Sequence, residues 1–170
     1  FAAPSQVNLL IPGAAATGLA ALTLTNNENQ TAANVINLMP VAPALFTADA
    51  SGRGIPAAVL LRIKADGTRS FEPVARYDAA QNRYVAQPIE FGAASDELYL
   101  LLFGTGLRGR TALANVTAAA GGISLPVSYA GAQGELSGLD QINLALPRAL
   151  AGRGELELRL TVEGQTSNAI

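Results

Sequence analysis

Residues 6–12 read QVNLLIP, and residues 141–147 read QINLALP. In both stretches apolar side chains recur at a period of two, which is typical of a β-strand with one buried face. Each stretch is followed by another alternating segment, LTLT at residues 22–25 and LRLTV at residues 158–162. We interpret this shared order as an internal repeat that marks equivalent strands in two related β units.

The second copy of the repeat has further strands in front of it. Residues 115–120 read as a strand, Gly121 and Gly122 as a two-residue hairpin turn, and residues 123–129 as the partner strand. The Ala-rich stretch 113–120 leaves a helix as the alternative. Strand is favoured there, because a Gly-Gly turn and another β run follow.

The first copy has no such front half. We therefore expect residues 1–44 to be the back half of a sandwich and residues 45–170 to be a complete sandwich. We also expect the natural protein to extend upstream of Phe1 and past Ile170, where the final strand is cut short. The predicted fold class is all-β, an immunoglobulin-like β-sandwich with one partial and one complete unit.

The middle of the chain predicts inserted hairpins around residues 57–97. Gly, Pro and Asn punctuate this region, and no window shows a helical period with caps. The strands expected here cover residues 57–64, 70–77, 84–91 and 97–103.

Composition excludes several classes of function. The chain has no Cys and no His, which excludes thiol nucleophiles, disulfides and histidine-dependent acid–base catalysis. Its net charge of −2 gives no electrostatic reason to bind nucleic acid or an anionic membrane. The most apolar run, residues 98–103, is far shorter than the roughly 20 residues of a membrane span. Charged residues make up only 14% of the chain, so we expect part of the surface to be covered by other domains or copies.

Residues 104–109 read GTGLRG, which matches the G-x-G-x-x-G pattern of dinucleotide-binding loops. That site needs an amphipathic helix after the loop and an acidic residue about 20 positions further on. Gly121, Gly122 and Pro126 interrupt the segment where the helix would lie. We therefore interpret Gly104 and Gly106 as part of a tight turn at a strand end, and we predict no cofactor.

Two segments weakly resemble metal sites. Asp49, Ser51 and Gly52 lie in a loop with a single carboxylate, whereas calcium requires several oxygen ligands. Asp140 stands beside Gln141 and is interpreted as a loop cap. We predict neither a metal site nor catalytic residues.

The tyrosines are the candidate sugar-stacking residues. They are scattered over separate predicted strands, so core positions or hairpin pairs are the simpler interpretation. The four are Tyr77, Tyr84, Tyr99 and Tyr129.

The arrangement of motifs resembles an uncharacterised C-terminal domain family of acidobacterial secreted proteins, which is related to IPT/TIG-type immunoglobulin-like modules. The matching pieces are residues 4–8 with 11–12, 41–47, 103–107, 129–131, 138–143 and 160–168. The resemblance covers nearly the whole chain, although the segment 62–97 is longer than the family pattern implies. It implies a secreted or cell-surface protein and no catalytic residues. The motif residues are Gln6, Asn8, Pro12, Gly104, Gly106, Tyr129, Asp140, Gln141, Asn143 and Asn168.

These observations favour a non-catalytic structural, adhesive or protein-interaction module. The alternatives are a carbohydrate-binding module and an accessory domain of a larger extracellular enzyme. The expected partners are neighbouring domains or other copies of the same protein, bound through exposed strand edges, with glycans as the alternative. We hypothesise that residues 1–40 pack against residues 45–170 or against a strand from another chain.

Overall fold

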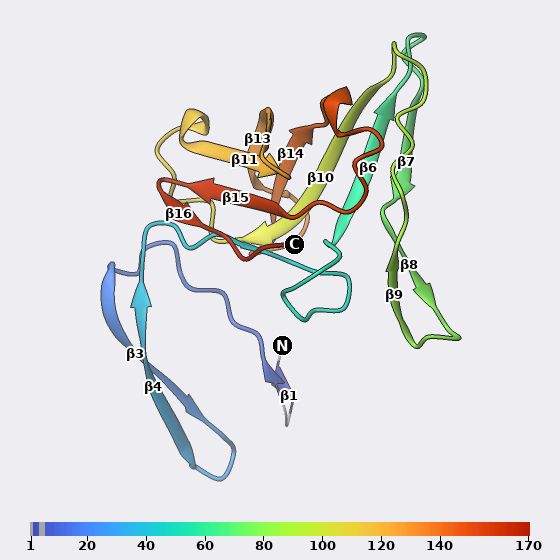
Figure 1. The fold of residues 1–170 in the computed structure, drawn as a ribbon. Coiled ribbons are helices and arrows are strands. Elements are labelled where there is room, and N and C mark those ends of the chain that lie inside the picture. The colour runs from blue at the N-terminus through green and yellow to red at the C-terminus, as the bar shows by residue number, and fades with distance from the viewer. Residues whose placement is uncertain (1, 4–5) are drawn as a thin grey trace. The chain divides into compact units, whose positions relative to one another are not determined.

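The computed structural model describes residues 2–3 and 6–170 and divides the chain into two compact units. Unit 1 is Phe1–Pro40 and unit 2 is Val41–Ile170. The described residues form antiparallel β-strands and two short 3-10 helices, and none of them lies in an α-helix (Figure 1). The all-β class predicted from the sequence is therefore confirmed.

Unit 1 contains two separate strand pairs. Strand β1 (Ala2–Ala3) pairs with β2 (Gln6–Val7), and β3 (Gly18–Thr25) pairs along its full length with β4 (Thr31–Leu38). The β3–β4 turn is closed by Asn26, whose side-chain oxygen accepts the backbone N–H groups of Glu28 and Gln30. No described residue of this unit is buried.

Unit 2 contains a six-stranded sheet with the order β13-β14-β10-β6-β7, in which β5 also pairs with β10. Every pairing in the sheet is antiparallel. The strands are β5 (Ala44–Leu45), β6 (Ala58–Ile63), β7 (Arg69–Pro73), β10 (Glu97–Thr105), β13 (Val127–Ala132) and β14 (Asp140–Ala145).

A four-stranded sheet with the order β12-β11-β15-β16 completes the main part of unit 2. Figure 1 shows β11 and β15 crossing in front of β10 and β14. The strands are β11 (Val116–Ala120), β12 (Ile123–Leu125), β15 (Leu158–Val162) and β16 (Gln165–Thr166). The 3-10 helices η1 (Leu113–Asn115) and η2 (Arg148–Leu150) precede β11 and follow β14.

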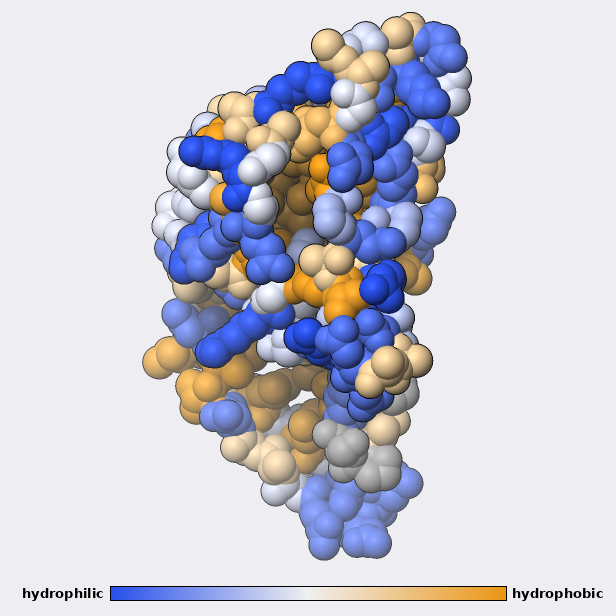
Figure 2. All heavy atoms as spheres, turned by 45° about the vertical axis from the view of Figure 1, so that its right-hand side comes forward, coloured by the Kyte–Doolittle hydropathy of each residue, from blue (hydrophilic) through white to orange (hydrophobic). Residues whose placement is uncertain are grey.

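The buried faces of both sheets share one hydrophobic core. Alternation along β10 buries Leu98, Leu100 and Leu102 and leaves Tyr99 and Leu101 on the opposite, half-exposed face. Burying one such leucine completely stabilises the fold by about 1.5–3 kcal/mol. Figure 2 shows that apolar side chains on the visible face also gather in patches bordered by hydrophilic ones.

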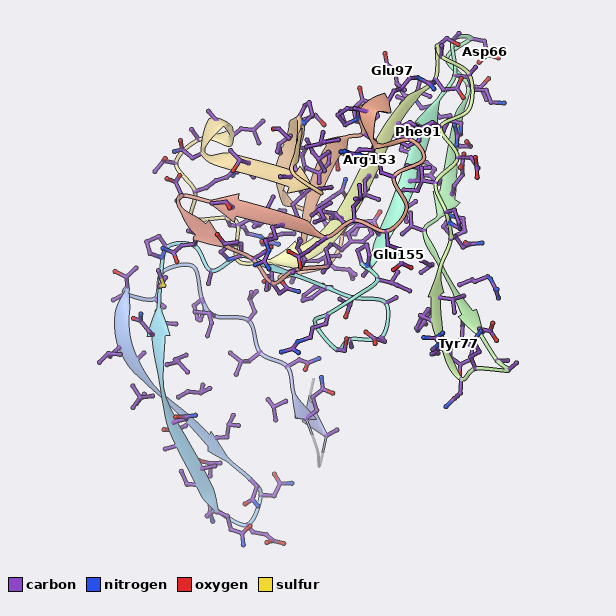
Figure 3. The ribbon with its side chains drawn as sticks, in the orientation of Figure 1. Asp66, Tyr77, Phe91, Glu97, Arg153 and Glu155 are labelled. Carbon is purple, nitrogen blue, oxygen red and sulfur yellow. The ribbon has the colours of Figure 1, made fainter. Side chains whose placement is uncertain are left out.

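A projecting hairpin follows β7. Strands β8 (Ala75–Asp78) and β9 (Arg83–Ala86) pair so that Tyr77 lies opposite Tyr84, with ring centroids 5.5 Å apart in an edge-on arrangement. The interpretation of these two tyrosines as a hairpin pair is confirmed. Figure 3 labels Tyr77 on this hairpin and Asp66 in the turn between β6 and β7.

The structure differs from the sequence prediction at several strands. The strand expected at residues 6–12 is formed only at Gln6–Val7, and the following residues are exposed. Strand β14, its counterpart in the predicted repeat, has β10 and β13 on its two edges, whereas among the described residues β2 pairs with the short β1 alone. A strand extends only as far as a neighbour pairs with its backbone, and the pairing with β1 ends at Val7.

Proline explains a second difference. Residues 123–129 were expected to be one strand, but they break at Pro126 into β12, which pairs with β11, and β13, which pairs with β14 in the other sheet. Proline has no N–H to donate to a ladder, so a strand ends there. The Ala-rich segment begins with η1 and continues as β11, so most of it is strand as predicted.

The predicted insertion is also only partly separate from the main fold. Strand β6 lies between β10 and β7 inside the large sheet and therefore belongs to the core. The strand expected at 70–77 breaks at the buried Val74, and the strand expected at 84–91 ends at Ala86. The unit boundary lies after Pro40 rather than after Ala44, since Val41 is 3% exposed and joins the core of unit 2.

Candidate functional site

Asp140 fastens the turn that follows β10 to the start of β14. Its carboxylate is buried and accepts hydrogen bonds from the backbone N–H of Leu107, at 2.9 Å, and from Nε of Arg108, at 2.5 Å. Arg108 also donates through Nη2 to the carbonyl of Leu139, at 2.8 Å. A buried carboxylate is tolerated only when it is paired in this way, so Asp140 is a structural anchor of the turn.

The two motif glycines lie where two backbone segments meet. A Cβ on Gly104 would overlap the carbonyl oxygen of Ala44, and a Cβ on Gly106 would overlap that of Ala42. Gly106 also has a φ of +82° and accepts a hydrogen bond from the N–H of Ala42. The turn predicted from GTGLRG begins at Gly106, whereas Gly104 lies within β10 and pairs with Leu45 and Asp140. The dinucleotide alternative lacks its helix, because η1 and β11 follow the turn.

Asn168 ties the C-terminal segment to β5. Its Oδ1 accepts the N–H of Leu45 at 2.7 Å, and its Nδ2 donates to the carbonyls of Leu45 and Gly52 at 3.0 and 2.8 Å. The Asn168 side chain therefore bonds to the N–H and the carbonyl of Leu45, as the backbone of a neighbouring strand would. Its role in the motif is to hold the two ends of unit 2 together.

The loop that weakly resembles a calcium site is closed on itself. Oδ1 of Asp49 accepts the hydroxyl of Thr47 and the N–H of Ser51, both at 3.0 Å. The backbone hydrogen bond from Ser51 is the main cause that lowers the pKa of Asp49. No group of three or more acidic side chains able to hold a metal ion occurs in the described part of the chain.

Sequence reasoning missed a buried arginine in the large sheet. Arg62 is 8% exposed and donates through Nε and Nη2 to the Glu72 carboxylate at 2.6 and 3.0 Å. It also reaches Asp96 at 3.3 Å and the Glu90 carbonyl at 2.6 Å. The Glu72 hydrogen bond raises the pKa of Arg62, and the same bond lowers the pKa of Glu72.

The Arg62 cluster holds the segment between β9 and β10 against the sheet. Gly92 lies against the Arg62 guanidinium. A larger residue would not fit there without a shift, because its Cβ would lie 2.7 Å from Nη1 of Arg62. Arg148 donates to the carbonyls of Phe91 and Gly92 at 3.2 and 3.3 Å. The available signal was an arginine at an inward position of the apolar strand 58–63.

A second missed cluster closes the β15–β16 turn. Oε1 of Glu163 accepts the N–H and hydroxyl of Thr111, at 2.7 and 2.8 Å, and Nδ2 of Asn115, at 3.0 Å. The Thr111 backbone bond is the main cause that lowers the pKa of Glu163. Its partners lie about 50 positions earlier in the chain, so no local pattern identifies them.

Three motif residues meet on the outer face of the large sheet. Tyr129 on β13 lies opposite Asn143 on β14, and Gly131 lies opposite Gln141. Nε2 of Gln141 donates to Oδ1 of Asn143 at 2.7 Å. With Arg110, whose Nη2 lies 3.8 Å from the position of a Cβ on Gly131, these residues form what we call the Tyr129 patch.

Residues 6–15, which include the first copy of the predicted repeat, contain two local hydrogen bonds that residues 141–150 also contain. Nε2 of Gln6 donates to Oδ1 of Asn8 at 2.6 Å, and the Pro12 carbonyl accepts the N–H of Ala15 at 2.9 Å. The Pro147 carbonyl accepts the N–H of Leu150 in the same way, at 3.0 Å. The surroundings differ, since Gln6, Asn8 and Pro12 are exposed. Phe1, Pro4 and Ser5 lie outside the described residues.

No helix of the described chain is apolar over a length that would cross a membrane. Comparison with known proteins finds no matching family model, no matching curated protein and no matching solved structure.

Proposed function

We propose that this chain is a non-catalytic structural or adhesive interaction module of a secreted or cell-surface protein. In this proposal both units are immunoglobulin-like sandwiches, and unit 1 is completed by β-strands from another polypeptide. One observation carries the proposal. Leu24 in unit 1 is 41% exposed, whereas Leu160, at the corresponding position of the repeat in unit 2, is 0% exposed.

One face of the β3–β4 hairpin carries apolar side chains that are exposed or half-buried. Strand pairing places Leu24, Leu22, Ile36 and Leu38 on the same side of the hairpin. None of these four side chains is buried, although the three apolar residues of β15 on the corresponding side are. An isolated two-stranded hairpin is at best marginally stable in water, so this face needs a partner.

Unit 2 indicates the chemistry of that partner. Strand β14 receives hydrogen bonds from β10 on one edge and β13 on the other, and β15 pairs with β11. Two of these neighbouring strands, β10 and β11, turn alternate apolar residues toward the core. The proposed partner of unit 1 is a strand-rich segment of the same pattern, which adds to exposed strand edges by β-augmentation.

The polar clusters support a non-catalytic role. Asp140, Glu163 and Arg62 each use their hydrogen bonds to hold loops of unit 2 in place. The resemblance of the sequence motifs to secreted proteins supports the proposed location.

Hydrogen exchange of the full chain tests the proposal. The probe is a peptide of residues 97–132, which contains β10 and β11, and the readout is amide protection at residues 6–11 and 18–38 measured by mass spectrometry. We expect fast exchange in these segments for the chain alone and slower exchange with the peptide. The matched control is the same peptide carrying Leu100→Lys and Val116→Lys, which places charges on the inner face.

Protection that appears with the first peptide and not with the control supports strand completion. Two results overturn it: strong protection of residues 18–38 in the dilute chain alone, and equal exchange with and without the unmodified peptide. Exchange in β14 and β15 of the same sample shows that unit 2 remains folded throughout.

A further inference from the structure

We infer that the Tyr129 patch binds an acidic saccharide, a sugar that carries a carboxylate such as a uronic acid. The patch consists of Tyr129, Gly131, Gln141, Asn143 and Arg110 on the outer face of the large sheet in unit 2. This inference does not depend on the strand completion proposed for unit 1.

Tyr129 supplies a fixed aromatic platform. The position of a Cβ on Gly131 would lie 3.1 Å from the Tyr129 hydroxyl and 3.4 Å from Cζ, so the phenol end of the ring lies over Gly131. The hydroxyl donates to the carbonyl of Ala132 at 2.5 Å, which fixes the ring along its own strand. Tyr129 is still 39% exposed, and an exposed ring held in this way can stack against the C–H face of a sugar.

The amides of β14 supply hydrogen bonds beside the ring. The bond between Gln141 and Asn143 uses one donor and one acceptor and orients both side chains. The described residues offer no partner to Oε1 of Gln141 or to Nδ2 of Asn143. The pair therefore presents one acceptor and one donor about 5 Å from the neighbouring side chains on β13, within reach of sugar hydroxyls.

Arg110 makes the site selective for an anion. The neighbouring Arg108 is neutralised by Asp140, but no carboxylate of the described chain lies within ion-pair distance of Arg110. Nε of Arg110 is buried without a hydrogen-bond partner. The donors that a ligand can reach are therefore those of Nη1 and Nη2, and this planar pair beside the Tyr129 ring matches the carboxylate of an acidic sugar.

The apolar neighbours favour a ring-shaped ligand over a simple anion. Asn143 lies between Tyr129 and Leu101 across the sheet, and Gln141 lies between Gly131 and Phe103. Asn143 is thus bordered by Tyr129 and Leu101, whereas Gln141 has Phe103 on one side and the backbone of Gly131 on the other. Sugar sites combine such flat apolar surfaces with a few fixed polar groups.

Titration of the full chain with trigalacturonic acid tests the inference, with galactotriose as the neutral comparison and acetate as the simple anion. Binding is followed by NMR of isotope-labelled tyrosine rings and arginine side chains. We expect shifts at Tyr129 and Arg110 with trigalacturonic acid and much weaker binding of the other two. Arg110→Gln should reduce the affinity by about tenfold or more, because a hydrogen bond between charged groups is lost.

The variant Arg110→Lys keeps the positive charge but loses the planar pair of guanidinium donors. Its affinity for trigalacturonic acid should lie between that of the parent and that of Arg110→Gln. Tyr129→Ala should abolish ring-dependent binding, and Asn143→Ala provides a second test if Tyr129→Ala does not fold. The control Arg153→Gln removes an exposed arginine from the loop before β15, labelled in Figure 3, and should bind like the parent. Three results overturn the inference: equal binding of the acidic and neutral trisaccharides, binding of acetate as strong as that of the trisaccharide, or no shift up to about 10 mM ligand.

Discussion

Single residues at the end of β10 determine how closely two backbone segments approach. Gly106→Ala should destabilise unit 2 by about 3 kcal/mol or more, because the new methyl group overlaps the Ala42 carbonyl and the backbone φ of +82° is unfavourable for alanine. Urea unfolding followed by circular dichroism measures this loss.

Gly122→Ala is the matched control for the same backbone conformation. Gly122 has a φ of +81° but open space at its Cβ position, so only the conformational cost of about 1–2 kcal/mol remains. Equal losses for the two variants would show that close approach to Ala42 does not constrain this turn.

The Arg62–Glu72 pair predicts a dependence of stability on pH. Arg62 lowers the pKa of Glu72 in the folded state, so the pair stabilises the fold fully above the unfolded pKa of about 4.3. This contribution is lost as the pH falls through the lower folded pKa. At pH 7, Glu72→Gln should cost about 1–2 kcal/mol, a modest value because 36% of the Glu72 side chain is exposed and water screens the pair.

The difference between the parent and Glu72→Gln should therefore shrink between pH 5 and pH 3 in unfolding measurements. Glu157→Gln is the control, because Glu157 pairs with Arg159 on the surface with 60% of its side chain exposed. A gap between the parent and Glu72→Gln that stays constant with pH would contradict the ion-pair account.

The role of a residue could be predicted from sequence where its partners are close along the chain, or where a glycine pattern marks a turn. The turn at Gly106 follows directly from a strand end and is confirmed, although Gly104 itself belongs to the strand. Arg62 and Glu163 depend on partners that only the fold brings near. An arginine inside an alternating strand indicates burial, but it does not indicate which carboxylate neutralises it.

Among the strand elements, β5 is held by a side chain on one side. Asn168→Ala should leave the buried N–H of Leu45 without its acceptor and cost about 2–3 kcal/mol. Hydrogen exchange at Leu45 should accelerate at least about tenfold, while the amide of Leu102 in the centre of the sheet stays protected. Asn168→Asp keeps the acceptor and loses the two donated bonds, so its effect should be smaller at Leu45. Unchanged exchange at Leu45 in the alanine variant would exclude the tethering role.

Strands, like single residues, were predicted correctly where the local pattern was sufficient and missed where a distant partner decides the structure. Strands β14 and β15 are predicted from their period of two, because one face of each is buried, and β10 is predicted from its apolar run. The period does not show which sheet a strand joins, so the change of sheet at Pro126 was missed. The stretch 6–12 has the same period, yet it is a strand only at its start, because alternation shows the capacity to pair and not the presence of a partner.

At the scale of the whole molecule, the two units should respond differently to the same change. Leu160→Ala removes a fully buried side chain from the shared core and should cost about 2–5 kcal/mol. Leu24→Ala, at the corresponding position of the predicted repeat, should cost less than about 1 kcal/mol in the chain alone, since Leu24 is already 41% exposed. Because two units need not unfold together, hydrogen exchange within each unit should accompany urea unfolding.

The two leucine variants distinguish a unit 1 that has a core of its own from a unit 1 that lacks covering strands. If unit 1 lacks only its covering strands, binding of the peptide of residues 97–132 should make Leu24→Ala costly, because the leucine then loses a buried position. The peptide should bind this variant more weakly than it binds the parent chain. A loss of stability from Leu24→Ala as large as that from Leu160→Ala in the free chain would mean that unit 1 already has a core of its own and needs no strands from outside.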